Sequence, residues 1–162
     1  MAKIQENIIE VKPQNALYET LGIMRELEKQ SLNDRDFNQF CLKTFLQKMQ
    51  PLKFSDFIES LHTWVKTNIQ YTDDLYDETL ISPRILFHTR KGDCDDFALF
   101  IKTVLSFFNI KSYYILFAKQ EDEYTHIANV VPLKNSFLFV DATNQEFNSF
   151  PYSRYNYFKI VR

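Results

Sequence analysis

One seven-residue segment, Gly92-Asp93-Cys94-Asp95-Asp96-Phe97-Ala98, constrains the fold of this chain more than any other. Its glycine and aspartates are typical of a turn that opens a helix, and the residues that follow are apolar on most sides of that helix. A helix that is apolar all round has to be buried by other elements. We therefore predict a central helix that begins at Cys94, runs to about Phe108 and ends with Asn109 as a left-handed cap.

A cysteine in the first turn of such a helix is well placed to act as a nucleophile. With Asp93 as the N-cap, Cys94 lies at the positive end of the helix dipole, beside backbone N–H groups that can hold an oxyanion. The carboxylates of Asp93, Asp95 and Asp96 act in the opposite sense, because nearby negative charge raises the pKa of a thiol. A thiolate is therefore expected only with an imidazolium nearby. Gly92 is expected to provide a positive φ or a close approach of the backbone.

A base and a carboxylate follow Cys94 along the chain. His126 lies in an apolar, strand-like run, and Asp141 follows the next such run. The connection between the runs is short, so the two strands should pair and bring the two side chains within reach of each other. A carboxylate on one ring nitrogen fixes the imidazole tautomer that a general base needs. Cys94, His126 and Asp141 form the predicted triad, although each taken singly also has a structural interpretation.

Apolar residues recur at spacings of three and four in three segments of the first half, which predicts amphipathic helices there. These helices cover residues 15–29, residues 33 or 34 to Pro51, and residues 55–68. The stretch 71–88 is rich in aspartate and contains Pro83, so it is interpreted as a polar loop.

Four segments after the central helix have the β-branched and aromatic residues typical of strands. They cover residues 112–118, 125–131, 137–140 and 155–161. Short polar connections predict that the middle strands form an antiparallel meander. The predicted fold class is α+β in a single domain over 1–162, with a helical N-terminal portion over 1–70 and the Cys-bearing helix packed on an antiparallel sheet over 71–162.

Three further residues have side chains that often carry chemistry. Cys41 falls on the apolar stripe of the second predicted helix, so it is expected to be a packing thiol and not to pair with Cys94. His62, on the third helix, is expected to be a partly buried or surface histidine. His88 is the rival of His126, because it lies closer to Cys94 in the sequence; it is expected at most at the entrance of the site.

Composition and charge exclude several classes of partner. The chain carries a net charge of −2 with mixed signs, which offers no basic surface for nucleic acid or anionic lipid. No run approaches the roughly 20 apolar residues of a membrane span, and the first residues lack the apolar core of a signal peptide. We expect a cytoplasmic protein. Scattered histidines and cysteines, and the lack of a calcium-loop spacing, predict no metal, and no cofactor is expected.

The segment from Tyr71 to Thr143 resembles the transglutaminase-like superfamily of papain-type folds. The resemblance rests on Tyr71, Ser82-Pro83, Gly92-Asp93-Cys94-Asp95-Asp96, His126 and Asp141-Ala142-Thr143, in that order. It covers under half of the chain, and it implies that Cys94 is the nucleophile, His126 the base and Asp141 its orienter. The Gly-Asp-Cys-Asp-Asp form is most similar to short bacterial and tailed-phage members, which are mostly predicted peptidases.

The expected function is therefore a cysteine peptidase, amidase or acyl transferase that acts on a protein or peptide amide through a thioester on Cys94. Tyr71 is expected to add an oxyanion donor, with Asp93 and Asp95 lining the site. The alternative is a structural or adaptor protein, for example a phage virion component, that keeps the fold without using the chemistry. In either case the helices of residues 1–70 are expected to dock a virion or other protein partner, and a phage-encoded chain would act in the host cytoplasm or the virion.

Overall fold

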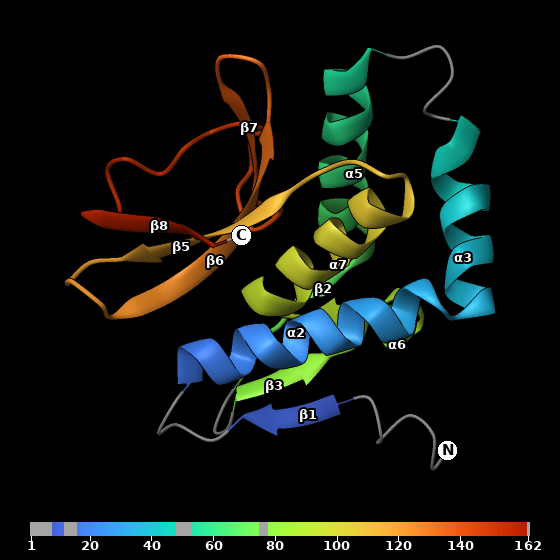
Figure 1. Ribbon diagram of the computed structural model, residues 1–162, viewed down its shortest axis with the longest axis horizontal. Coiled ribbons are helices and arrows are strands. Elements are labelled where there is room, and N and C mark those ends of the chain that lie inside the picture. The colour runs from blue at the N-terminus through green and yellow to red at the C-terminus, as the bar shows by residue number, and fades with distance from the viewer. Residues whose placement is uncertain (1–7, 12–15, 48–52, 75–77, 162) are drawn as a thin grey trace.

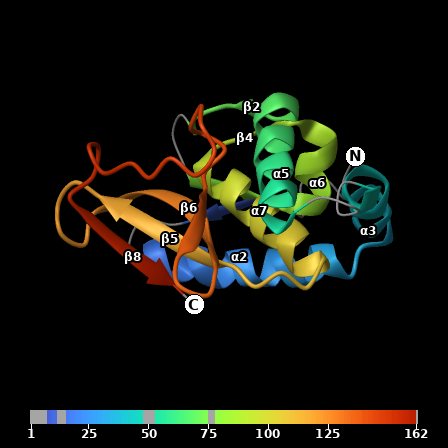
Figure 2. The ribbon, with the colours of Figure 1, turned by 90° about the horizontal axis from the view of Figure 1, so that it is seen from above.

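The computed structural model describes residues 8–11, 16–47, 53–74 and 78–161, and it has helices on one side and an antiparallel sheet on the other (Figure 1). Helix α7 (Cys94–Phe107) lies in the middle of the molecule, with the sheet to one side of it in both views (Figure 1 and Figure 2). Most of its side chains from Asp96 onward are buried. Asn109 follows with a φ of 56°, so the prediction of a buried central helix with a left-handed cap is confirmed.

Three helices form where the apolar spacing predicted them: α2 (Ala16–Leu32), α3 (Arg35–Cys41) and α5 (Phe54–Asn68). Asp34 caps α3 by accepting a hydrogen bond from the Phe37 N–H at 2.9 Å. The chain continues into a short, wider helical turn, η2 (Leu42–Leu46). Cys41 is fully buried in the core, which confirms its role as a packing thiol. None of the helices in the described ranges combines the length and the apolar character needed to cross a bilayer.

The interpretation of residues 71–88 as a polar loop is wrong. Four short elements lie in and around this stretch: β2 (Gln70–Tyr71), β3 (Glu78–Ile81), α6 (Pro83–Thr89) and β4 (Lys91–Gly92). Pro83 occupies the first turn of α6, where a fixed φ favours a helix start and the missing N–H costs nothing. Strand β3 pairs with β1 (Ile8–Val11), a partner far away in the sequence. The local sequence pattern therefore did not predict β3, whose partner is remote, and Pro83 was compatible with either a loop or the start of α6.

The sheet consists of four antiparallel strands in the order β7-β6-β5-β8. Their bounds are β5 (Tyr113–Ala118), β6 (Tyr124–Pro132), β7 (Phe137–Val140) and β8 (Tyr157–Val161). The meander of β5, β6 and β7 confirms the prediction. Strand β8 returns to the other edge of β5, and it begins two residues later than the predicted range, so Tyr155 lies in the segment that leads into the strand.

Both faces of the sheet are apolar. In β6, Ile127 and Val131 pack into clusters shared with α7 and the other helices. Ala128 and Val130 lie on the opposite face in a cluster with Phe117. A strand that is buried on both faces has little freedom to slip in register, because a shift by one residue would exchange the two sets of side chains. The register of β6 in turn determines where His126 lies.

The start of α7 is tied to the rest of the fold through Asp96, which is 2% exposed. Its Oδ1 accepts a hydrogen bond from the Ile81 N–H at 2.7 Å, and its Oδ2 accepts one from the Asp93 N–H at 3.2 Å. Gly92 lies against this carboxylate, since a Cβ at Gly92 would come within 2.6 Å of Asp96 Oδ2. Its φ is not positive, so close approach is the requirement that Gly92 meets.

Gly92→Ala is expected to lower the free energy of unfolding by about 2 kcal/mol, because the new methyl group overlaps a buried carboxyl group held in place by two backbone N–H groups. The matched control is Gly22→Ala in α2, where an added Cβ meets nothing within 4 Å. Helix propensity should make that variant more stable by about 0.5 to 1 kcal/mol. Urea denaturation measures both changes, and a Gly92→Ala protein as stable as wild type would contradict the close packing.

Candidate active site

The first turn of α7 is closed by a capping box formed by Asp93, a predicted site residue, and Asp96. The Asp93 carboxylate accepts hydrogen bonds from the Asp95 and Asp96 N–H groups at 3.1 and 3.4 Å, while Asp96 accepts from the Asp93 N–H. We expected several unpaired N–H groups here, but the box occupies two of them. The N–H of Cys94, the first donor of the helix, stays outside the box.

The Cys94 thiol lies between this turn and strand β6. Its Sγ is 3.5 Å from Oδ1 of Asp95, and the backbone N–H of Ile127 also bonds to the sulfur. Burial raises the pKa of the thiol far above its ordinary value, and the charges of Asp95 and Asp93 raise it further, while the Ile127 N–H acts in the opposite sense. Burial and the two aspartates therefore favour a protonated thiol in the resting site.

His126 and Asp141 are joined directly. His126 Nε2 lies 2.7 Å from Asp141 Oδ2, and Asp141 is 5% exposed. Burial by itself would raise the pKa of Asp141, but the hydrogen bond and charge of His126 and two hydrogen bonds from Thr143 outweigh it, so the pKa is lowered. An additional bond comes from Asn144 Nδ2 at 3.2 Å. With this carboxylate ionised, Nε2 carries a proton and Nδ1 keeps the lone pair of the neutral ring.

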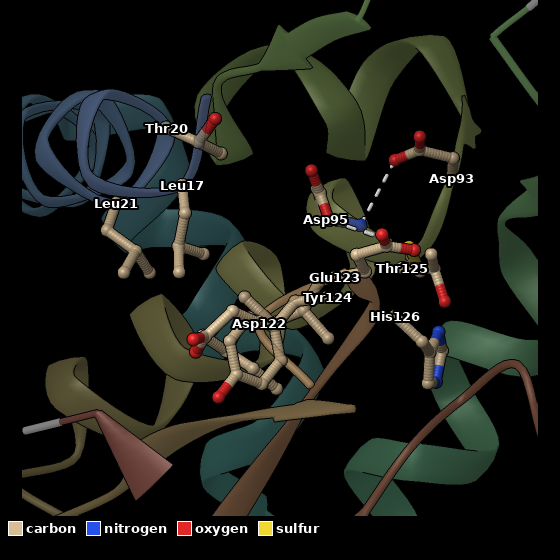
Figure 3. Close-up of a pocket in the computed structure, with 13 residues that line it drawn as sticks. Leu17, Thr20, Leu21, Asp93, Asp95, Asp122, Glu123, Tyr124, Thr125 and His126 are labelled. Atoms are coloured by element: carbon tan, nitrogen blue, oxygen red, sulfur yellow. Dashed lines mark hydrogen bonds between the residues drawn. The ribbon is translucent and has the colours of Figure 1, made fainter. Parts of the chain in front are cut away.

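A cleft of about 410 Å³ is lined by both Cys94 and His126. Figure 3 shows His126 beside the other labelled residues of its wall. Helix α2 supplies one wall through Leu17, Thr20 and Leu21. The facing wall consists of the start of β6 and the turn before it. The sulfur contacts the N–H of the β6 residue that follows His126, so the structure places thiol, imidazole and carboxylate at one end of the sheet. The N-terminal portion of the chain thus forms part of the cleft itself.

The remaining predicted residues lie at different distances from this cleft. Asp93 and Asp95 line it. Tyr71 does not line it: the strand pairing of β2 with β4 sets Tyr71 opposite Gly92, and the Tyr71 ring packs edge-on against Phe97. Burial and a side-chain hydrogen bond with Asp73 raise the pKa of Tyr71. Its hydroxyl is therefore engaged with Asp73.

The three histidines take different positions. His88 packs on the Phe87 ring and stays outside the lining of the cleft. His62 is 2% exposed, more buried than expected, and its Nε2 donates a hydrogen bond to the Asp141 carbonyl oxygen at 3.0 Å. Burial lowers the pKa of His62, which keeps the ring neutral. Sequence patterns missed this support of the Asp141 turn, because α5 and the turn meet only in the folded chain.

One group of ligating side chains in the described part of the chain could share a metal ion. It consists of Asp93, Cys94 and Asp95, whose ligand atoms lie within 4.8 Å of one another. The capping box and the contact between the thiol and Asp95 account for the positions of all three, so the geometry needs no ion to explain it.

Comparison with known proteins agrees with the resemblance in the sequence. A family profile described as "Transglutaminase-like domain" matches residues 42–160. A comparison with curated proteins gave no match. The matched range includes the predicted triad and leaves out α2, although α2 forms one wall of the cleft.

Similar folds occur in solved structures of bacterial proteins. Calcium-bound LapG of Legionella pneumophila has a TM-score of 0.59 at 15% identity over 85% of this chain and 81% of LapG. A protein of Cytophaga hutchinsonii, provisionally named a cysteine protease, has a TM-score of 0.54 at 17% identity over 67% of this chain. This chain spans only 37% of the length of the Cytophaga protein. At such identities the likeness establishes a papain-type, transglutaminase-like fold and nothing further about activity.

Asp95→Asn is expected to lower the pKa of the Cys94 thiol, because it removes the nearest negative charge that opposes thiolate formation. The measurement is the pH dependence of alkylation by iodoacetamide, with the modified cysteine identified by peptide mapping. In the wild type the midpoint should lie well above the roughly 8.5 of a free thiol, and in Asp95→Asn it should move down. Buried Cys41, with a pKa raised to about 12, is the internal reference.

The matched control for this experiment is Asp122→Asn. Asp122 also lines the cleft, but it is not among the groups that shift the pKa of Cys94. Equal midpoints in the Asp95 and Asp122 variants would contradict a direct effect of Asp95 on the thiol.

Proposed function

This chain belongs to the family of transglutaminase-like domains, and from that premise we propose that it is a cysteine-dependent amide hydrolase or acyl transferase. Cys94 is the nucleophile, His126 the general base and Asp141 the carboxylate that orients the base. The observation that carries the proposal is the 2.7 Å bond between His126 Nε2 and Asp141, made by a ring that shares a cleft with the thiol. Both cysteines are free, in keeping with action in a reducing cytoplasm.

The protonation states determine how the first step proceeds. Because burial and the aspartates keep the Cys94 thiol protonated, the sulfur has to lose its proton as it attacks. Nδ1 of His126 takes that proton while the bond from sulfur to the substrate carbonyl carbon forms. The carbonyl π electrons move to the oxygen, and the Asp141 charge stabilises the imidazolium. In this scheme the base acts during the attack and not before it.

The oxyanion of the tetrahedral intermediate needs donors at the helix start. The Cys94 N–H lies outside the capping box and at the positive end of α7, so we assign it this role. One such donor is commonly worth about 3 kcal/mol in the rate. Tyr71 becomes a second donor only if its hydroxyl leaves Asp73.

The intermediate then collapses to a thioester. The carbon–nitrogen bond breaks, and His126 gives its proton to the leaving amine. Water or a second amine attacks the thioester in turn; His126 removes a proton from that nucleophile and returns it to the Cys94 sulfur. Hydrolysis and transfer share every protein group up to this point, so the incoming nucleophile decides between them.

The charge of the cleft points to the kind of peptide that it accepts. Four carboxylates line it, and in the described part of the chain no lysine or arginine does: the four are Asp93, Asp95, Asp122 and Glu123. Complementary charge favours encounter and register in a complex. We propose a protein or peptide substrate with a basic side chain next to the amide that reacts.

The alternative of a structural or adaptor protein is kept, because one observation favours it. The pKa of the Cys94 thiol is raised, whereas a nucleophilic cysteine commonly has a lowered pKa. In that case the fold would be used for binding alone, with the helices of the N-terminal portion as the docking surface.

Reaction with p-nitrophenyl acetate tests the nucleophile. Wild type should release p-nitrophenolate in a burst and carry an acetyl group on Cys94, seen by mass spectrometry of peptides. Cys94→Ala should lose the burst, and His126→Ala should slow it by about a hundredfold or more, the usual size of general-base effects. Cys41→Ala is the control and should keep the burst. Acetylation of Cys41 and Cys94 at equal, slow rates would favour the adaptor alternative.

Substrate charge is tested with a matched pair of esters, N-acetyl-lysine and N-acetyl-norleucine p-nitrophenyl esters. The lysine ester should acylate Cys94 about three to five times faster at low salt, the size expected of an exposed ion pair. A double variant, Asp122→Asn with Glu123→Gln, should remove most of that preference, as should high salt. Equal rates for both esters at low salt would refute the role of the acidic lining.

A further inference from the structure

Tyr155, which is not one of the predicted site residues, packs on the imidazole ring of His126. The ring centroid of Tyr155 lies 5.8 Å from that of His126, and the two planes differ by only 6°. Phe117 lies 5.9 Å from the same imidazole and 5.3 Å from the Tyr155 ring. The His126 ring therefore packs against two members of an aromatic cluster, Phe117 and Tyr155.

The backbone around Tyr155 is held in place, although Tyr155 precedes the strand. The Arg154 N–H donates to the Pro151 carbonyl, which closes a turn just before it. On the other side, the Asn156 N–H donates to the Ala118 carbonyl at 3.1 Å, and Asn156 Nδ2 donates to the Lys119 carbonyl at 2.9 Å. These bonds fasten the segment to the end of β5, so the stacked ring is carried by a fixed piece of chain.

The position of the ring separates it from the path of the substrate. Tyr155 is half-buried, and it does not line the cleft that contains Cys94. Burial raises the pKa of Tyr155, and the charge of Asp141 raises it further. The ring therefore contacts the imidazole from outside the substrate space.

We propose that Tyr155 is a positioning residue for His126. Its ring restricts rotation of the imidazole, so that Nε2 stays on Asp141 and Nδ1 faces the cleft, and it keeps water away from the hydrogen bond between them. A hydrogen bond shielded from water is electrostatically stronger, and an aromatic face next to a ring that becomes an imidazolium stabilises the added charge. The inference rests on the proposed function of His126 as the base.

The test separates the ring from its hydroxyl with two variants, Tyr155→Phe and Tyr155→Leu. The rate of acetylation of Cys94 by p-nitrophenyl acetate should be retained in Tyr155→Phe and should fall about tenfold in Tyr155→Leu, the rate equivalent of one aromatic stacking contact. The control is Tyr152→Leu, in the same segment, because Tyr152 is 77% exposed and its ring packs on Phe150 and not on His126. Urea denaturation of each variant shows that it is folded.

A second readout does not depend on activity. Solvent exchange of the His126 Nε2 proton, followed by NMR of the ring, should be slow in wild type and Tyr155→Phe and clearly faster in Tyr155→Leu. A Tyr155→Leu protein with unchanged exchange and acetylation overturns the proposal, and so does a Tyr155→Phe protein as impaired as Tyr155→Leu. If the wild type is not acetylated at Cys94, the proposed function fails, while proton exchange still decides the positioning role of Tyr155.

Discussion

The structure depends most on the capping box at the start of α7. The first N–H groups of a helix have no partners within the helix, so other groups have to satisfy them. Asp93 and Asp96 satisfy three of these donors between them, and Asp96 extends the network to Ile81 of β3. Burial and the neighbouring aspartates raise the pKa of Asp96 well above its ordinary value. Burial of this carboxyl group is unfavourable, but its hydrogen bonds fix the helix start and with it the position of the Cys94 thiol.

The same aspartates set the chemical character of the site. They hold the start of α7, yet their charge disfavours a thiolate at Cys94. The site therefore differs from one in which a thiolate and an imidazolium are paired before the substrate binds. Asp141 has the opposite environment, with donors from His126 and Thr143 that lower its pKa despite burial. Burial and one carboxylate cluster thus disfavour a thiolate at Cys94, while a separate carboxylate, Asp141, accepts the hydrogen bond of His126. Such a division is consistent with general-base catalysis of the attack.

The cleft and its support extend beyond the segment matched by the family. Helix α2 lies outside the matched range and still provides one wall of the cleft. Within the matched range, His62 of α5 donates a hydrogen bond to the Asp141 carbonyl oxygen, and Tyr155 packs on His126. The proposed catalytic side chains are therefore enclosed by parts of the chain that carry no motif.

By itself, the sequence determined the features that depend on neighbours along the chain. The cap at Asp93, the apolar length of α7, the amphipathic helices and the meander of β5 to β7 are local patterns, and they were predicted correctly. Tertiary structure alone decided which distant groups meet: the pairing of β3 with β1, the bond from His62 to Asp141 and the stacking of Tyr155 on His126. It also decided the direction in which the pKa of Cys94 moves. Burial is the largest influence on that thiol, and burial exists only when remote segments have packed around it.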